Sequence, residues 1–270
     1  CIRDSTRAIL PPNSSMSRYL PYVHDQGQTG MCVAYALASA RTILYARNKN
    51  MYDQKEISRA SFSPYFIYYH GKRADDNDCM KGISPFIGLY LLDSFGVPKI
   101  MDVECTDYYP CTNQMLCNYY PPDWSQDVTN ASLYKIDNYY ALTTLNDIKS
   151  AILSGNPCLY GIKTVPSFKY NMDGKDMWSP DADESVEDSE AIHALVVISY
   201  DDTKYGGAFQ VLNSWGYDWG NQGTAWIPYD DFFEFGVASF SIHRRYESSR
   251  YTTRSPDINN INIPDSSGYN

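Results

Sequence analysis

The chain has no long apolar run and few histidines, and these absences limit what it can be. No stretch of about 18 or more consecutive apolar residues occurs, so the sequence holds no candidate for a helix that spans a bilayer. Only four histidines are present, none of them beside a cysteine pair, and there is no C-x-x-C motif. A zinc site or a thiol redox centre therefore has little support, and we predict neither a metal nor a cofactor.

Positive charge is also scarce. The 32 acidic residues outnumber the 22 basic ones, which gives a formal net charge of -10. A strongly negative protein repels phosphate backbones and anionic lipid headgroups, so we expect neither nucleic acid nor a membrane surface as a partner. The 270 residues, 43% of them hydrophobic, are enough to bury a substantial core, in one large domain or in two lobes that share a cleft.

Cysteine occurs in an odd number, seven, so at least one thiol is unpaired within the chain. Four of them fall in one loop-rich region, which favours one or two local disulfides and an extracytoplasmic location: Cys79, Cys105, Cys111 and Cys117. The chain opens on Cys1 without an apolar signal segment, so we expect that a targeting peptide was removed or left out. Cys1 is either the lipidated first residue of a mature bacterial lipoprotein, which would be the chain's one membrane contact, or an arbitrary boundary.

The hydrophobic pattern changes from helical to strand-like along the chain. Residues 32–47, rich in Ala and Leu and without Gly or Pro, predict a helix, and shorter helices are predicted at 63–69, 84–96 and 145–153. From residue 158 onward, short β-branched and aromatic runs separated by Gly, Asp and Asn predict strands. We therefore predict an α+β protein with a mainly helical lobe at about 20–125 and a mainly β lobe at about 126–247. Residues 103–128 show no clear period, and 248–270 are predicted to form a polar tail.

Three places in the sequence carry residue types suited to nucleophilic catalysis. Cys32 lies in the first turn of the predicted helix, where free backbone N–H groups and the helix dipole lower the pKa of a thiol. His193 opens an apolar strand, where an imidazole has no packing role, and residues 213–223 (NSWGYDWGNQG) crowd tryptophans and glycines into one turn. Taken alone, Cys32 is more typical of a buried packing residue, and His193 of a structural histidine.

Together, these residues resemble the active-site blocks of the papain family of cysteine peptidases. The similarity rests on three blocks in the family's order: Gln26-Gly27 with Cys32 six residues after the glutamine, His193 at the start of a strand, and NSWGYDWGNQG at 213–223. It covers about residues 20–245, and we assign residues 1–250 to one peptidase domain. The resemblance implies a helical lobe and an antiparallel β-barrel-like lobe, with the active site in the cleft between them.

The resemblance also implies a role for each matching residue. Cys32 would attack the peptide carbonyl as a thiolate paired with protonated His193, and Asn213 would orient the imidazole. The side-chain amide of Gln26 and the backbone N–H of Cys32 would stabilise the oxyanion, and Trp215 would shield the bond between His193 and Asn213 from water. The remaining matches would contact the substrate and form a pocket for an apolar side chain two residues before the cut: Gly82, Ile83, Ser84 and Ile192.

The cysteine block departs from the family pattern at three positions. Thr29 stands where the family has its first cysteine, Met31 replaces a serine, and Val33 replaces a tryptophan. The family's disulfide to the cysteine that matches Cys79 therefore cannot form, and the expected alternative is a bond from Cys79 to Cys117 or another neighbour. Cys158, on an apolar strand, is predicted to be a buried free thiol.

We predict a cysteine peptidase, with alternatives left open. An aminopeptidase, a transpeptidase or a peptide-crosslinking enzyme would share the acyl-enzyme, and a catalytically silent relative would only bind peptides. The expected partners are a peptide or protein substrate and an inhibitor or removed prosegment, because only 31 residues precede Cys32; we expect a monomer. The acidic run at 181–190 is interpreted as a solvated, mobile loop; if it borders the cleft, it should favour basic substrates and raise the pKa of His193.

Overall fold

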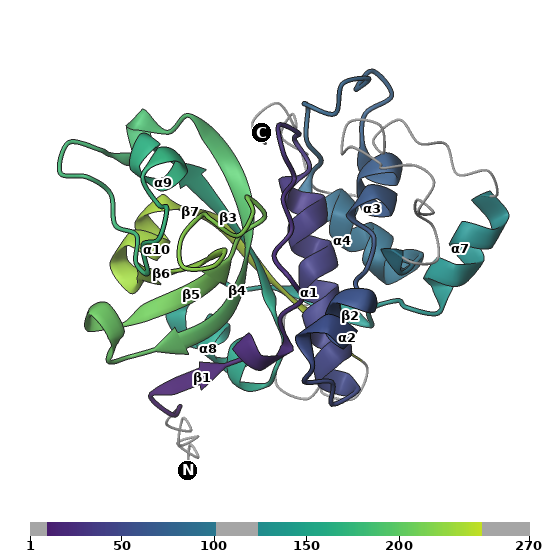
Figure 1. Ribbon diagram of the computed structural model, residues 1–270, viewed down its shortest axis with the longest axis horizontal. Helices are drawn as coiled ribbons and strands as arrows, with labels where there is room; N and C mark the ends of the chain where they lie inside the picture. The colour runs from purple at the N-terminus through teal and green to yellow at the C-terminus, as the bar shows by residue number, and fades with distance from the viewer. Residues whose placement is uncertain (1–9, 101–123, 245–270) are drawn as a thin grey trace, which may run out of the picture.

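A long helix, α1 (Cys32–Asn48), runs through the middle of the molecule, with most of the β-sheet on one side and the helices of the other lobe beyond it (Figure 1). The computed structural model describes residues 10–100 and 124–244. Cys1, Cys105, Cys111, Cys117 and the predicted tail lie outside these ranges, as does most of the stretch predicted to lack a period.

The helices that follow α1 begin where the sequence supplies a cap. α2 (Gln54–Arg59) follows Asp53, whose carboxylate accepts a hydrogen bond from the N–H of Glu56. α3 (Pro64–Gly71) follows Ser63, whose hydroxyl accepts one from Phe66, and α4 (Pro85–Ser94) likewise has a proline at its first position. The predicted helices at 32–47, 63–69 and 84–96 are confirmed, and α2 and α7 (Trp124–Ser132) are additional to them.

The described part of the chain contributes seven strands to one antiparallel sheet. They are β1 (Asn13–Ser15), β2 (Asn138–Ala141), β3 (Cys158–Thr164), β4 (Ala191–Asp201), β5 (Ala208–Leu212), β6 (Thr224–Pro228) and β7 (Gly236–His243). Their order is β2-β7-β3-β4-β5-β6, and β1 pairs with the last residues of β4, beyond those that pair with β3. The sheet is not closed into a barrel, so the lobe expected to be barrel-like is an open sheet.

Short helices connect the strands. α8 (Leu145–Leu153) has the predicted bounds because Thr144 and Asp147 form a reciprocal capping box, each side chain accepting from the other's backbone N–H. α9 (Pro166–Tyr170) and α10 (Tyr229–Phe235) are one to two turns long, and single 3-10 turns occur at Ser17–Tyr19, Val186–Asp188 and Lys204–Gly206. The predicted strands correspond to β3 through β7, whereas β1 and β2 were not expected.

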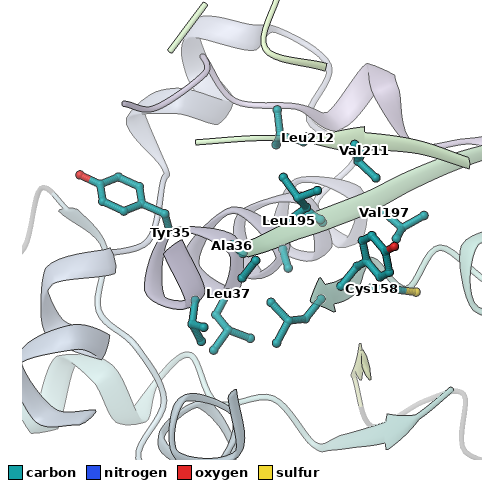
Figure 2. Packing of buried hydrophobic residues seen from close by; sticks show 14 of the residues in the cluster. Tyr35, Ala36, Leu37, Cys158, Leu195, Val197, Val211 and Leu212 are labelled. Atoms are coloured by element: carbon teal, nitrogen blue, oxygen red, sulfur yellow. The ribbon is translucent and has the colours of Figure 1, made fainter. Parts of the chain in front are cut away.

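The core joins α1 to the sheet. Ala36 and Leu37 of α1 belong to the same cluster of buried apolar side chains as Leu195 and Val197 of β4 (Figure 2). Cys158 of β3, the register partner of Val197, is buried in this cluster as a free thiol, as predicted. Because α1 is buried along nearly its whole length, its first residue is held in a fixed position against β4.

Candidate active site

Cys32 is the first residue of α1 and its side chain is buried. Backbone N–H groups of the first turn of the helix and of Ala194 in β4 lie close enough to its sulfur to favour the thiolate. Ala194 directly follows His193 along that strand. The fold therefore brings the thiol, which begins a helix, against the strand residue that directly follows His193.

The imidazole of His193 is oriented by Asn213, the residue that follows β5. Nε2 of His193 lies 2.7 Å from Oδ1 of Asn213, and the same oxygen accepts a bond from the backbone N–H of Ser214, also at 2.7 Å. Because a backbone N–H can only donate, the Ser214 bond fixes which amide atom faces the ring, and Nε2 must carry the proton. Nδ1 is then the basic nitrogen of the neutral ring, and it has no hydrogen-bond partner among the described residues.

Trp215 covers one face of His193. The two rings are stacked, with centroids 4.2 Å apart and planes 29° from parallel. Phe168 and Trp219 both pack edge-on against the indole of Trp215. Trp219 is itself buried and donates from Nε1 to the carbonyl of Phe168 at 3.0 Å. The turn that contains these tryptophans thus packs an aromatic cluster against the ring of His193.

Gln26 is buried rather than exposed on the surface. Its Nε2 donates to the carbonyl of Thr29 at 2.7 Å, and its Oε1 accepts from the hydroxyl of Ser214 at 2.8 Å. The backbone N–H of Gln26 also donates to the carbonyl of Ser214, 2.8 Å away. One hydrogen of Nε2 is used by Thr29, which leaves the second available to another acceptor.

The site combines a buried thiol at the start of a helix, an imidazole bonded to an asparagine, a tryptophan stacked on that imidazole and a buried glutamine. This combination matches the pattern of one family. The model for "Papain family cysteine protease" matches residues 13–243, a range that contains all of these residues. The chain belongs to the papain family of cysteine proteases.

Relatives within and near this family are distant in sequence. An uncharacterized peptidase C1-like protein of Acanthamoeba polyphaga mimivirus is 27% identical over 80% of this chain and 67% of its own length. Cathepsin C of Schistosoma mansoni is 25% identical over 79% of this chain but 45% of its own length, so the chain spans less than half of that protein.

The similarity to solved structures covers a larger share of the chain than the similarity to these two relatives. Xylellain, a cysteine protease from Xylella fastidiosa, has a TM-score of 0.71 at 23% identity, with 88% of each chain covered. The bromelain protease from Ananas comosus, solved in complex with the E64 inhibitor, has a TM-score of 0.63 at 16% identity and covers 87% of this chain and 100% of its own. The fold is therefore the papain-like α+β fold, as expected.

The departures from the papain-family pattern have local consequences. The hydroxyl of Thr29, which stands in place of a cysteine, donates to the carbonyl of Gln26 at 2.8 Å and closes the turn that leads to α1. The backbone N–H of Gly30 donates to the carbonyl of Cys79 at 2.7 Å. The loop before Gly82 is thus joined to the cysteine block by a backbone hydrogen bond at the place where the family has a disulfide.

The residues expected to bind substrate differ in exposure. Ile192, which precedes His193 in β4, and Trp215, which stacks on the ring of His193, are partly exposed, whereas Gly82 and Ser84 are buried. Gly82 adopts a φ of +68°, a conformation that favours glycine. Ile83 is buried as well, and its Cδ1 atom is 3.2 Å from where a Cβ on Gly71 would stand, so its side chain packs against α3.

A buried pair that sequence analysis did not single out supports the loop before Gly82. The hydroxyl of Tyr68 donates to the carboxylate of Asp76 at 2.6 Å, and the backbone N–H of Gly82 lies near the same hydroxyl. Asp76, which is fully buried, also accepts from the N–H of Met80 at 3.1 Å. Asp76 lies among several surface acids in the sequence ADDND, and nothing in that pattern distinguishes it. Ser214 was also missed, although it lies within the NSWG motif.

Burial governs the ionisation of Cys32 and His193. It raises the pKa of the Cys32 thiol to about 11, while the backbone N–H of Ala194 acts in the opposite direction. It lowers the pKa of His193 to about 4, against the bond to Asn213, which raises it. Each charge alone is therefore disfavoured. Transfer of one proton from the thiol to the imidazole adds no net charge to the site and creates two charges that attract each other.

The acidic run at 181–190 folds back on α9 and the end of β3. Glu184 accepts a bond from the backbone N–H of Ser167 at 2.8 Å, and the N–H of Glu190 donates to the carbonyl of Thr164 at 2.9 Å. Lys169 also lies 3.3 Å from the carboxylate of Glu190. The pKa of His193 is lowered by burial, and none of the carboxylates at 181–190 is among the causes of this shift, so the run does not produce the increase that the sequence suggested if it bordered the cleft.

Proposed function

We propose that this chain is a cysteine endopeptidase that cleaves peptide bonds through a thioester acyl-enzyme on Cys32. The observation that carries the proposal is the 2.7 Å hydrogen bond from Nε2 of His193 to Oδ1 of Asn213, because it leaves Nδ1 as the basic nitrogen. Family membership and the contact of the Cys32 sulfur with Ala194 support the same assignment.

The proposed reaction has two halves. The sulfur of Cys32 attacks the peptide carbonyl carbon while its proton resides on Nδ1 of His193, and the C–N bond then breaks as His193 gives that proton to the departing amine. Water next attacks the thioester, His193 accepts a proton from it, and the proton returns to the thiolate as the acid product leaves. Asn213 keeps accepting from Nε2–H throughout, so the ring stays oriented for both transfers.

The oxyanion of each tetrahedral intermediate would be held by two donors. These are the backbone N–H of Cys32, at the start of α1, and the Nε2 hydrogen of Gln26 that Thr29 does not use. The bond from Ser214 to Oε1 fixes the amide plane of Gln26 in advance. A donor held in place before the reaction stabilises the developing charge without reorganisation.

The thiolate–imidazolium pair has support from its surroundings. The first turn of α1 and the N–H of Ala194 donate toward the sulfur, which favours the thiolate. The face of Trp215 lies 4.2 Å from the ring of His193, where an aromatic surface attracts a cation. We propose that these contacts offset the burial penalty once the proton has moved from sulfur to nitrogen.

Substrate preference rests on fewer residues. We propose that the backbone at Gly82 binds an extended peptide and that Ile192, Ser84 and Trp215 border the cleft, with an apolar side chain preferred two residues before the cut. Ile83 would act from beneath, by holding the loop against α3 and α4. Aminopeptidase, transpeptidase and crosslinking activities would use the same groups, and a silent peptide-binding protein remains the alternative from a different class.

We further propose that Cys79 forms a disulfide with one of the cysteines in the 105–117 region and that the protein works outside the cytoplasm. The proposal is supported by the described cysteines, because Cys32 and Cys158 are free thiols and Cys79 is set apart from them. None of the described helices combines the length and the apolar character that crossing a bilayer requires. We also propose that the domain spans residues 1–250 with its lobes divided near 125, that it is monomeric, and that an inhibitor or prosegment restrains it.

The proposal is tested by labelling with a limiting amount of an active-site-directed thiol electrophile, followed by intact mass, across pH 4 to 9. Rapid single labelling at Cys32 well below the free-thiol pKa of about 8.5, lost in Cys32→Ala and slowed in His193→Ala, is the expected result. Cys158→Ala serves as the matched control, because Cys158 is also a buried free thiol. Labelling that rises only near pH 8 would favour the silent binding protein.

A further inference from the structure

A cavity of about 510 Å³ lies at the end of α1 far from Cys32. Its wall comes from the second half of α1, from residues 133–137 before β2 and from the end of β7. Arg41, the deepest charged residue, is nine positions after Cys32, which corresponds to roughly 13 Å along the helix axis at about 1.5 Å per residue. The cavity is therefore separate from the candidate active site.

Arg41 is an incompletely bonded guanidinium at the floor of this cavity. The residue is 7% exposed, and burial lowers its pKa to about 10, with the charge of Arg244 acting in the same direction. Its Nε donates to the carbonyl of Tyr134 at 3.0 Å, and its Cζ lies 4.5 Å from the ring centroid of Phe62. No described residue accepts a hydrogen bond from its two terminal nitrogens, and the guanidinium forms no ion pair with any described carboxylate.

Three further cations surround Arg41 at the rim: Lys49, Lys135 and Arg244. All three are exposed, and none takes part in an ion pair within the described ranges. Among the described residues that line the cavity, Asp137 is the one carboxylate, and it does not reach ion-pair distance of Arg41. In a chain with a formal net charge of -10, this concentration of positive charge is local.

The helix dipole accounts for only part of the pattern. Cations in the last turn of a helix are favoured by its negative end, which explains Lys49 at the C-cap of α1. Arg41 lies two turns earlier, and a buried charge without a partner is costly unless something neutralises it. A guanidinium with free paired N–H groups matches the spacing of two oxygens on one phosphorus, sulfur or carbon atom.

We propose that this cavity is a binding site for a tetrahedral oxyanion, held by the fork of Arg41 and by Lys49, Lys135 and Arg244 at the rim. The volume exceeds what a bare phosphate ion needs, and Tyr45 and Tyr134 add aromatic surface to the wall. The oxyanion is therefore either free or the end group of a larger ligand.

The test is isothermal titration of the full chain with inorganic phosphate at neutral pH and constant ionic strength, with phenyl phosphate as a second ligand. We expect saturable one-site binding with a Kd below about 10 mM. A lower Kd for phenyl phosphate would identify the end group of a larger ligand, and an equal or higher Kd would identify the free ion. Both results support the site, whereas no saturable binding of either compound would overturn it.

Variants locate the binding. Lys135→Gln and Arg244→Gln should each raise the Kd by about two- to fivefold, which is typical of partly exposed charge contacts, and Asp137→Asn should lower it by a similar factor. Arg41→Met should abolish phosphate binding. If the Arg41→Met variant fails to fold, the Lys135→Gln and Arg244→Gln variants still test the proposal. The exposed Lys175, on the other lobe, supplies the control Lys175→Gln, which should bind as the wild type does.

A Kd that is unchanged in the Lys135→Gln/Arg244→Gln double variant would place the bound phosphate elsewhere and refute the proposal. Cys32→Ala should bind phosphate with the wild-type Kd, because the cavity shares no residue with the candidate active site. Failure of the peptidase proposal and failure of the oxyanion proposal are therefore distinguishable.

Discussion

The hydroxyl of Ser214 donates to Oε1 of Gln26 across 2.8 Å, although the two residues are 188 positions apart in the chain. This bond fixes the amide of Gln26 with its Nε2 directed toward Thr29, the residue that leads to Cys32. It assigns Ser214 a positioning role: it would act on the oxyanion through Gln26 without touching the substrate.

Replacement of Ser214 therefore tests how Gln26 works. Ser214→Ala should lower kcat about tenfold with little change in KM, because one neutral hydrogen bond is lost, and Gln26→Ala should lower it about 100-fold. In the Gln26→Ala background, Ser214→Ala should cause little further loss, since both act through the same donor. Steady-state kinetics of the two single variants and the double variant give the coupling, and independent, additive losses would contradict this role.

Asn213 should control both the rate and its pH dependence. Asn213→Ala removes the acceptor for Nε2–H and should reduce kcat/KM about 100-fold, within the range of positioned general acid–base catalysis. Because the bond to Asn213 raises the pKa of His193, its loss should also move the alkaline limb of the pH profile to lower pH. An unshifted alkaline limb in the variant would assign that limb to another group.

Asp76 should matter for stability far more than its neighbour Asp75. Asp76→Ala leaves the hydroxyl of Tyr68 without its acceptor and the N–H of Met80 with only the 3.3 Å bond to Asp78, and should lower the free energy of unfolding by about 1–3 kcal/mol. Asp75 pairs with Arg73 and Lys81 at the surface, so Asp75→Ala should leave stability nearly unchanged. Urea denaturation of both variants is the measurement, and equal midpoints would show that the buried contacts of Asp76 contribute nothing.

Stability should fall as the pH drops below about 6.5. Burial lowers the pKa of His70 and His243 from 6.5 to about 4. At a pH between these two values, each histidine is neutral in the folded chain but protonated in the unfolded chain. The unfolded state then binds more protons between these pH values, which means that stability rises with pH across this window and is lost as pH falls from 6.5 toward 4.

Thermal unfolding of the wild type and of His243→Gln between pH 4.5 and 7.5 tests this dependence. The variant should show a shallower decrease in Tm on acidification, because one of the buried imidazoles has been removed. His24→Gln is a useful comparison, since burial lowers the pKa of His24 in the same direction. Parallel Tm curves for wild type and His243→Gln would exclude His243 as a source of the acid sensitivity.

The sequence predicted those helices and strands that are determined by residues within or directly beside them. α8 has its predicted ends because its cap, Thr144 with Asp147, lies beside the helix in the chain, and α1 follows from a run of helix-forming residues. β1 could not be predicted in this way: its three polar residues form a strand only because the last residues of β4 have an unpaired edge next to them.

The residues of the candidate site were likewise predictable only where the signal lies in a local sequence motif. Cys32, His193 and Asn213 could be named because each stands in a motif with a chemical signature. The buried position of Ile83 and the support of Gly82 by Tyr68 and Asp76 could not, because they depend on how α3 and α4 pack. The incompletely bonded guanidinium of Arg41 was also invisible, since its surroundings come from segments about 90 and 200 positions away.

The pairing of residues 24–26 with 214–216 has a consequence for how the protein is made. The N–H of Gln26 bonds to Ser214 and the N–H of Gly216 bonds to His24, so the start of the chain is completed by residues that are synthesised near its end. A ribosome adds residues in order, and domains fold as their last contacts become available. A nascent chain that ends before β5 would contain Cys32 but neither Asn213 nor the partner of Gln26. The proposed reactivity of the thiol would therefore be complete only after residues 213–216 have been synthesised and have paired with residues 24–26.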